Sequence, residues 1–409
     1  ARELGSTTRW VAVAALTLAL TTTQAMGVVA QDEAASEDPP PADLLPGVDL
    51  ETEEVEPGVY RVLSDGVRGL TRPIEFSFFD THMSPGDLHR LNALATRGLA
   101  ANANGVWLGG PDGIFRLGQE DLVWEQEPSR EWWEAGFDVA PDDTIYRPGR
   151  GQVLKGGKWK RPLPKFAAFK ASHGADALFT SDGAYWTKGT NGKQRDARRA
   201  VLVRRDDDGW SRVKNPPEPP GRKKDARPAS IDLWGVTDDG VLYITRAHRH
   251  VQRFEDGRWD TLPAPGGRIA DLHVGADGTV WVERQEEDRW TYGGGSEVVR
   301  LGEDGWTGFE IGAPRYLYPS PDTVAPDGAF WAAPAGNLMH DGGCDGILRL
   351  GDAGMDRFLL EKCVYDIAAG PNGELWAEAG SWEGNWYAPE SVGPVELYLI
   401  TPEAWASDE

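Results

Sequence analysis

The sequence predicts an all-β protein, a seven-bladed β-propeller made of four-stranded antiparallel blades. Three observations predict this class: a recurring hairpin phrase, the spacing of its copies, and the fixed places of the tryptophans. The phrase reads VGADGTVW at 274–281 and VAPDGAFW at 324–331. Its Asp-Gly dipeptide tolerates the positive φ values of a tight turn, and the flanking residues alternate as in half-buried strands.

The copies of the phrase define seven units, separated by 38 to 57 residues. Each unit reads as a strand, a turn, a strand ending in Trp or Tyr, a variable loop, a third strand, a short turn and a fourth strand. No long helical periodicity occurs outside residues 84–96, so we expect four strands in each unit. The turn positions are Gly105, Asp143, Gly183, Gly240, Gly278, Gly328 and Gly373.

The tryptophans recur at two places in the unit. A blade packs both of its faces against its neighbours, so large flat rings at a fixed depth fill the space between sheets. We therefore interpret these residues as core rather than as cofactor contacts. Second strands end on Trp107, Trp186, Trp281, Trp331 and Trp376, and fourth strands begin near Trp124, Trp159, Trp210, Trp259 and Trp306.

Closure of the ring is predicted to join the two ends of the chain. Residues 57–67, PGVYRVLSDGV, have the pattern of a third strand and its turn. We expect them to complete the last blade, whose late strand is VELYLI at 395–400.

The N-terminal region has the pattern of an export signal. Arg2 and Arg9 precede an apolar run at 10–20, which has the length of a signal-peptide core, and residues 28–30 suit cleavage before Gln31. The alternative is that residues 10–30 attach the protein to the membrane as a signal anchor. Both alternatives place the body of the protein outside the cytoplasm.

Three regions follow from these patterns. Residues 1–30 form the signal peptide or signal anchor, residues 31–56 an acidic Pro-rich linker, and residues 57–409 the propeller.

The formal net charge of −23 disfavours nucleic acid as a partner, because phosphates would be repelled over most of the surface. Residues 188–227 depart from this balance, with thirteen Lys and Arg against six Asp and Glu. We interpret this insert as a solvated loop, with a partner-binding or anion-binding role as the alternative.

The phrase DGTVW at 277–281, followed by VVRLGEDGW at 298–306, resembles the two-component-regulator type of propeller repeat. It is similar, more distantly, to the blades of virginiamycin B lyase. The resemblance covers about residues 57–405 and implies an extracytoplasmic sensing or binding role. The lyase family has a histidine and a divalent metal at the mouth of its channel, but no residue here is matched to those positions.

The variable loops are predicted to emerge on one face, which we call the long-loop face, and binding residues commonly lie on such loops. Aromatic residues are frequent in these loops and could stack on a sugar or another flat ligand. The partner is expected to be a small molecule, a glycan or a protein. The candidate ligand-binding residues are Trp290, Tyr292, Trp382, Trp386, Tyr387, Trp132 and Trp133.

The first strand of each blade is expected to line the central channel. Asp176, Asp271 and Asp366 lie seven residues before their turn glycines, and His273 and Asp138 lie five residues before their turn positions. Such carboxylates with a histidine could serve acid–base chemistry. They could also bind a divalent cation, with Asp271, Asp366 and His273 as the candidate ligands. The favoured alternative is structural, with each Asp accepting backbone hydrogen bonds between blades.

The preferred function is a binding or sensing module on the long-loop face rather than an enzyme. No Gly-rich phosphate cradle and no GxSxG elbow occur. A metal-dependent lyase or lactonase with a channel-mouth site is one alternative, and a protein–protein interaction scaffold is another. Cys344 and Cys363 are expected on one face, and an oxidising compartment favours a disulfide between them.

Overall fold

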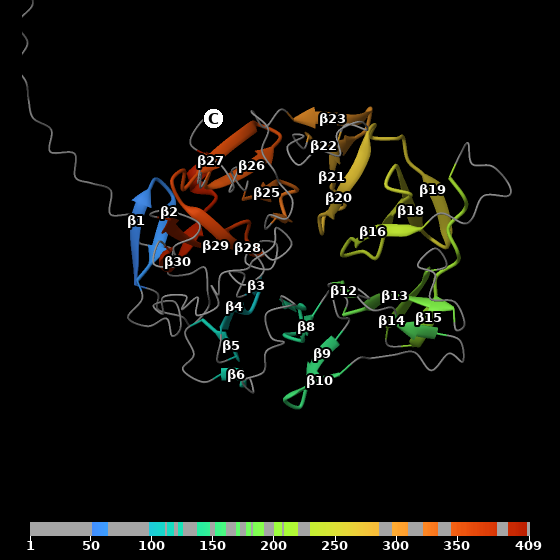
Figure 1. Cartoon of the computed structure of the whole chain (residues 1–409), viewed down its shortest axis with the longest axis horizontal. Coiled ribbons are helices and arrows are strands. Elements are labelled where there is room, and N and C mark those ends of the chain that lie inside the picture. Colours follow the sequence, from blue (N-terminus) through green and yellow to red (C-terminus); the bar gives the residue numbers. More distant parts are fainter. Residues whose placement is uncertain are drawn as a thin grey trace, which may run out of the picture. The chain divides into compact units, whose positions relative to one another are not determined.

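In the computed structural model, all described residues belong to one unit, Pro41–Glu409 (Figure 1). The structure describes residues 51–63, 98–110, 113–117, 122–125, 137–147, 152–160, 169–171, 177–180, 183–191, 200–206, 208–219, 230–285, 297–309, 322–333, 345–382 and 392–406. The predicted export signal therefore lies outside the described residues, as does most of the predicted linker.

The described residues form seven antiparallel sheets in chain order, which we number as blades 1 to 7 (Figure 1). Blade 1 consists of β3 (Leu99–Asn102), β4 (Gly105–Gly110), β5 (Gly113–Arg116) and β6 (Leu122–Glu125). Blade 2 consists of β7 (Asp138–Val139), β8 (Ile145–Arg147), β9 (Gln152–Lys155) and β10 (Lys158–Lys160). Blade 3 consists of β11 (Phe169–Ala171), β12 (Ala177–Phe179), β13 (Tyr185–Asn191), β14 (Ala200–Asp206) and β15 (Gly209–Arg212), with β11 and β12 both paired to β13.

The remaining blades continue the same plan. Blade 4 consists of β16 (Ile231–Val236), β17 (Leu242–Arg246), β18 (His250–Glu255) and β19 (Arg258–Thr261). Blade 5 consists of β20 (Arg268–Val274), β21 (Val280–Gln285), β22 (Glu297–Gly302) and β23 (Gly305–Phe309). Blade 6 consists of β24 (Asp322–Val324), β25 (Phe330–Ala332), β26 (Ile347–Gly351) and β27 (Gly354–Phe358). Blade 7 has the order β1-β2-β30-β29-β28, with β1 (Thr52–Glu56), β2 (Val59–Val62), β28 (Cys363–Ala369), β29 (Leu375–Trp382) and β30 (Val392–Ile400).

Seven hydrophobic clusters join the blades, each between two consecutive sheets, and the last joins blade 7 to blade 1. In every cluster the aromatic residue of a second strand packs towards the following blade. These residues, in order, are Trp107, Tyr146, Trp186, Tyr243, Trp281, Trp331 and Trp376. The ring is therefore closed, and the protein is a seven-bladed β-propeller.

The interpretation of the second-strand tryptophans as core is confirmed. Trp281, Trp331 and Trp376 are fully buried. The indole Nε1 of Trp281 also donates a 2.9 Å hydrogen bond to the carbonyl of Gly328 in blade 6. The hairpin turns follow the predicted chemistry, because Gly278 has a φ of 90° and Asp143, which replaces a glycine, has a φ of 64°.

Arginines of the third strands contact these rings, which the sequence pattern did not predict. In four blades an arginine lies directly opposite the buried tryptophan, 5.3 to 5.8 Å from its ring centre. Such contacts contribute on the order of 0.5–2 kcal/mol each. The pairs are Trp107–Arg116, Trp186–Arg204, Trp281–Arg300 and Trp331–Arg349.

The two ends of the chain meet in blade 7, as predicted. Strand β2 pairs antiparallel with β30, with Val59 opposite Ile400. The segment takes an outer position in the blade, and β1, at the end of the predicted linker, adds a fifth strand outside it. The short helix α2 (Glu403–Ala406) then places Trp405 5.1 Å from the ring of Trp331 in blade 6.

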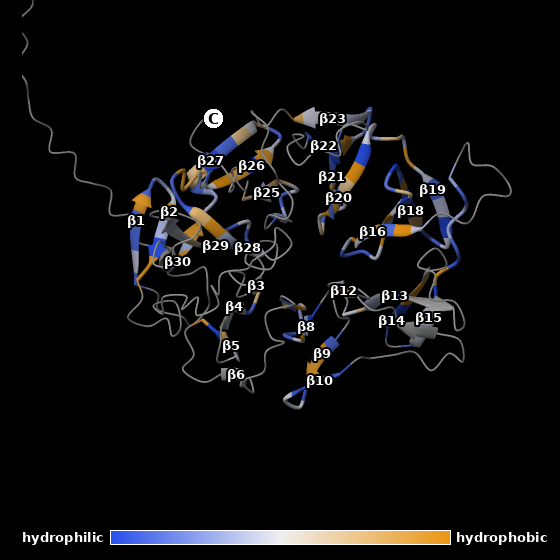
Figure 2. Ribbon diagram, viewed as in Figure 1, coloured by the Kyte–Doolittle hydropathy of each residue, from blue (hydrophilic) through white to orange (hydrophobic). Residues whose placement is uncertain are grey.

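Hydrophobic and hydrophilic residues are interspersed along strands such as β20 and β21 (Figure 2), and apolar residues of these strands, such as Leu272 and Val282, pack between neighbouring blades. Among the described residues, no helix has both the length and the apolar character needed to cross a bilayer.

Candidate functional site

The first strands of the blades contact one another around the centre of the propeller. The contacts run from β28 to β3, from β3 to β7, from β12 to β16, from β16 to β20, and on through β24 back to β28. Five of these strands carry an aspartate. The aspartates are Asp138 in β7, Asp232 in β16, Asp271 in β20, Asp322 in β24 and Asp366 in β28.

A β-bulge shapes three of these strands at the same place. The register shifts between Ile269 and Asp271 in β20 and between Val364 and Asp366 in β28, with a similar shift in β16. A bulge re-aims the side chains beside it, and bulges are common next to functional sites. The oxygen Oδ1 of Asp271 accepts a 2.7 Å hydrogen bond from the next backbone N–H, and that of Asp366 accepts one of 2.9 Å.

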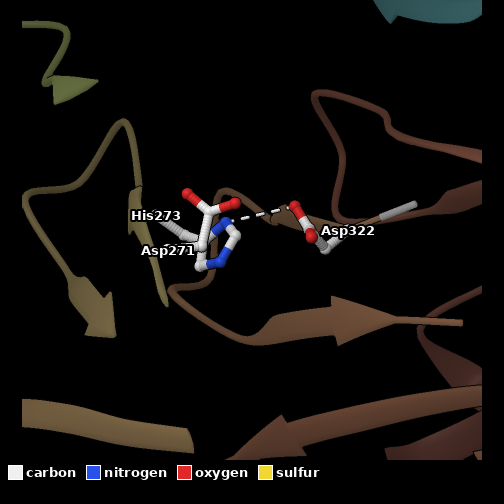
Figure 3. A group of neighbouring side chains, drawn as sticks. All are labelled: Asp271, His273 and Asp322. Atoms are coloured by element: carbon white, nitrogen blue, oxygen red, sulfur yellow. Dashed lines mark ion pairs between the residues drawn. The ribbon is translucent and has the colours of Figure 1, made fainter. Parts of the chain in front are cut away.

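His273 lies between the carboxyl groups of Asp322 and Glu283, and Figure 3 shows its ion pair with Asp322 and the nearby Asp271. Its Nδ1 is 3.1 Å from Oδ1 of Asp322, and its Nε2 is 3.4 Å from Oε1 of Glu283. Ligating atoms of Asp271, His273 and Asp322 all lie within 4.8 Å of one another. We call Asp271, His273, Glu283 and Asp322 the acid–histidine cluster.

The strand register explains why these side chains meet. His273 is paired with Trp281 across β20 and β21, so both side chains face blade 6, and the His273 ring lies 4.9 Å from that of Phe330. Asp322 lies two residues before Val324, which packs against the cluster between blades 5 and 6. Asp322 therefore faces back towards blade 5, and the two side chains meet between the sheets.

The charges of the cluster determine the protonation of His273. Burial lowers the pKa of His273, but Asp322, Glu283 and Asp271 outweigh this effect and hold the pKa well above its usual value. Burial raises the pKa of Glu283, although His273 opposes the shift. The surrounding carboxyl groups thus favour the charged form of the imidazole.

Glu283 is the most buried member of the cluster, with 1% of its surface exposed. Its oxygen Oε1 faces His273, whereas Oε2 has no hydrogen-bond partner within the described part of the chain. A buried acceptor without a partner costs about 1–3 kcal/mol, and more when it is charged. A donor supplied by a ligand would remove this cost.

Asp366 and Asp138 also lie on first strands, but their carboxyl groups accept hydrogen bonds from other groups of the protein. Burial, together with the charges of Asp138 and Asp322, raises the pKa of Asp366 to about 7 against the effect of two backbone N–H donors. Oδ2 of Asp366 accepts a 2.8 Å hydrogen bond from the N–H of Leu99 in blade 1. Oδ2 of Asp138 accepts a 2.6 Å bond from the hydroxyl of Tyr146.

The structure thus brings two of the candidate residues, Asp271 and His273, into one cluster. It places Asp366 outside that group, while Asp176 lies outside the described residues. Sequence reasoning missed Asp322, because this residue falls at a position that is mostly apolar in the other units. It also missed Glu283, although a signal was present: Asp271 and Glu283 are twelve residues apart, and Asp366 and Glu378 repeat this spacing.

The aromatic loop residues remain predictions. Trp382 is the last residue of β29, and the other six candidates lie outside the described residues. Cys363 begins β28, but Cys344 is not among the described residues, so the disulfide also remains a prediction.

A scan against protein-family models found no match, and a search of curated proteins found none either. Similar solved structures include virginiamycin B lyase from Staphylococcus aureus, in a catalytically inactive form with quinupristin. It is 16% identical, with 65% of this chain and 94% of that chain covered and a TM-score of 0.38.

Two further similar structures are propeller-containing or extracellular domains. The extracellular domain of the putative one component system BT4673 from B. thetaiotaomicron is 12% identical, covering 74% of this chain and 37% of that chain with a TM-score of 0.40. The Cps50 (Swd1) β-propeller domain of Myceliophteria thermophila is 13% identical, covering 69% of this chain and 92% of that chain with a TM-score of 0.44. These values are low, so the fold assignment rests on the seven sheets of this chain. By fold and site, the chain is a β-propeller with an acidic centre.

Proposed function

We propose that this protein is an extracytoplasmic binding or sensing module that holds a positively charged group of its ligand at the acid–histidine cluster. The observation that carries the proposal is the buried oxygen Oε2 of Glu283, which has no hydrogen-bond donor within the described part of the chain.

The cluster favours a cation for two reasons. Three carboxyl groups surround one imidazole, so acidic groups outnumber the basic one in the cluster. Carboxylate oxygens accept hydrogen bonds and cannot donate them when ionised, and an ammonium group supplies three donors. Charge-assisted bonds of this kind are stronger than bonds between neutral groups.

The rest of the ligand would be recognised on the long-loop face. The aromatic residues predicted there suit stacking on a sugar ring or contact with an apolar side chain. Small molecules, glycans and peptides all remain within this proposal, provided that they carry a cationic group.

Calorimetric titration with primary amines tests the proposal, with ethanolamine and glycinamide as probes. We expect saturable binding that weakens about tenfold or more in Glu283→Gln and Asp322→Asn, because each variant removes one charged acceptor. Asp304→Asn, an exposed position on the turn between β22 and β23, serves as the matched control. Equal binding by all four proteins would contradict the proposal.

A metal-dependent lyase or lactonase is the second candidate, favoured by the spacing of the ligating atoms of Asp271, His273 and Asp322. Two carboxylates and an imidazole within 4.8 Å of one another suit a divalent ion such as Zn²⁺ or Mn²⁺. These three residues would hold the ion, and a bound ion would supply Lewis-acid polarisation of a carbonyl group.

Metal titration separates the two candidates. Stoichiometric uptake of Zn²⁺ or Mn²⁺ that is lost in Asp271→Asn and retained in Asp366→Asn would favour the enzyme. Uptake that is unchanged in Asp271→Asn would rule out the cluster as the metal site.

A further inference from the structure

Blades 2 and 3 meet at one hydrophobic cluster that reaches their outer strands. Val153 of β9, Tyr185 of β13 and Trp210 of β15 all belong to this cluster. Trp210 packs edge-on against Tyr185, with ring centres 5.8 Å apart, and remains partly exposed. The position of Val153 and Trp210 therefore identifies which faces of the two blades are turned towards each other.

Strand pairing places basic side chains on these two faces. Val153 is paired with Lys160 of β10, and Trp210 is paired with Arg205 of β14. Paired residues point to the same side of a sheet, so Lys160 faces blade 3 and Arg205 faces blade 2. Residues two positions apart in a strand also share a side, which adds three more cations. These are Lys155 and Lys158 on blade 2 and Arg212 on blade 3.

We call Lys155, Lys158, Lys160, Arg205 and Arg212 the basic rim, and the structure exposes all five side chains.

The charges of the basic rim are not balanced by the protein itself. Lys155 and Lys158 lie directly opposite each other, and like charges in this position repel. Within the part of the chain that the structure describes, no ion pair involves any of the five residues, and Arg212 donates a 3.3 Å hydrogen bond to the neutral Asn215. The chain as a whole has a net charge of −23, so this concentration of unpaired cations is exceptional. A bound anion would remove the repulsion.

We propose that the basic rim binds an acidic polysaccharide, with carboxylates of the sugar between the lysines of blade 2 and the arginines of blade 3. Arginine can hold a carboxylate through two parallel hydrogen bonds, and lysine attracts it as a point charge. Lys158 and Lys160 repeat at about 7 Å along β10, so one extended ligand can contact several cations.

Trp210 favours a sugar over an acidic peptide as this ligand. Its indole is partly exposed on the face that carries Arg205 and Arg212, and an aromatic ring offers an apolar surface to a sugar ring. The basic rim lies between blades 2 and 3 and attracts anions, whereas the acid–histidine cluster lies between blades 5 and 6. The polysaccharide proposal therefore does not depend on the cationic ligand proposed above.

Calorimetry at low ionic strength tests the class of ligand with three probes. These are oligogalacturonate, its methyl ester, which keeps the sugar rings without the charges, and oligoglutamate with the same number of charges. We expect oligogalacturonate to bind about tenfold or more tightly than either of the others, because only this probe combines charge with a sugar ring. Its affinity should fall as salt is added, since the cations are exposed.

Variants assign the binding to the basic rim. Combining Lys160→Gln with Arg205→Gln should weaken the binding of oligogalacturonate by about tenfold or more, because one cation is lost on each blade. Trp210→Leu should weaken oligogalacturonate and leave oligoglutamate unchanged. Arg258→Gln, at an exposed arginine of β19 in blade 4, is the matched control and should bind as the wild-type protein does. A cooperative thermal transition identifies the variants that are folded.

Each contrary result overturns a stated part of the proposal. Equal binding of oligogalacturonate and its methyl ester, or unchanged binding by the combined Lys160→Gln and Arg205→Gln variant, overturns the basic rim as the site. Oligoglutamate that binds as tightly as oligogalacturonate, or a folded Trp210→Leu variant with unchanged affinity, overturns the polysaccharide and favours an acidic peptide. A folded wild-type protein that binds no oligogalacturonate overturns the whole proposal and leaves the test with primary amines unaffected.

Discussion

The oxygen Oδ2 of Asp366 in β28 accepts a hydrogen bond of 2.8 Å from the N–H of Leu99 in β3, although the two residues are 267 positions apart. This bond crosses the seam where blade 7 meets blade 1. The second oxygen of the same carboxylate accepts from the N–H of Ile367. One aspartate thus accepts hydrogen bonds from the backbone of both blades, which is the structural role predicted for the first-strand aspartates.

The stability of the ring should depend on pH through Asp366. The pKa of this carboxyl rises from about 4 in the unfolded chain to about 7 in the fold, mainly through burial. Folding then favours the neutral form, so the stabilisation is complete below pH 4 and is lost as the pH rises through 7. When the pH is raised from 4 to 7.5, the Tm of Asp366→Asn should fall by less than the Tm of the wild-type protein. The two decreases should differ by roughly 2 °C or more.

The matched control for this experiment is Asp304→Asn, which should keep the pH profile of the wild-type protein because the residue is exposed. A profile for Asp366→Asn that parallels the wild-type profile would show that Asp366 does not titrate in this range.

The protonation of His273 should depend on Asp322. The wild-type imidazole is expected to titrate well above pH 6.5, because Asp322 and Glu283 stabilise its charged form against burial. In Asp322→Asn the pKa should fall, as measured by NMR of histidine-labelled protein. The pKa of His250, which burial and Arg249 lower, should not change and identifies any general effect of the mutation.

Blade packing should be most sensitive at the second-strand rings. Trp281 is fully buried and its indole nitrogen bonds the next blade, so Trp281→Ala should destabilise the protein by about 3–5 kcal/mol. Denaturant unfolding measures this change. Trp259→Ala, at a partly exposed fourth-strand ring, should cost clearly less, and equal costs would contradict the assignment of Trp281 to the core.

Ring closure through the N-terminal strand can be tested by two substitutions of the same kind. Val59 in β2 is fully buried beside blades 6 and 7, whereas Val55 in β1 is 41% exposed. Val59→Asn should destabilise the protein by about 2 kcal/mol or more, since it buries a polar amide, and Val55→Asn should stay within about 0.5 kcal/mol. Similar unfolding midpoints for both variants would indicate that β2 contributes little to closure.

The predicted disulfide between Cys344 and Cys363 can be tested by peptide mapping without reduction. We expect one linked peptide and no alkylation of either thiol. A disulfide that closes a loop as short as the one from Cys344 to Cys363 stabilises a fold by about 3 kcal/mol. Reduction should therefore lower the unfolding midpoint. Recovery of both cysteines as alkylated peptides would contradict the pairing.

The repeat architecture was predictable because its signals are local. Turns such as the one at Gly278 need a positive φ, and the strands beside them alternate between two faces, so a short window of sequence is sufficient. The role of Trp281 followed from the same pattern, since a large apolar ring at a fixed position requires a neighbouring sheet. The joining of residues 59–62 to the last blade was also readable from their pattern.

The site was only partly predictable because it forms between sheets. His273 and Asp322 are 49 residues apart, and they lie on opposite faces of their respective strands. Alternation within one strand predicts which side chains share a face, but it does not predict which residue of the next blade will meet them. That residue depends on the stacking of blades 5 and 6 and on the bulge before Asp271.

The amino-acid sequence by itself therefore determined a closed ring of seven small sheets, because hairpin turns and strand alternation depend on neighbouring residues. Only the tertiary structure decided that His273 lies between Asp322 and Glu283, because the packing of one blade on the next sets those distances. The same packing buries the Oε2 atom of Glu283, which makes this cluster the candidate site.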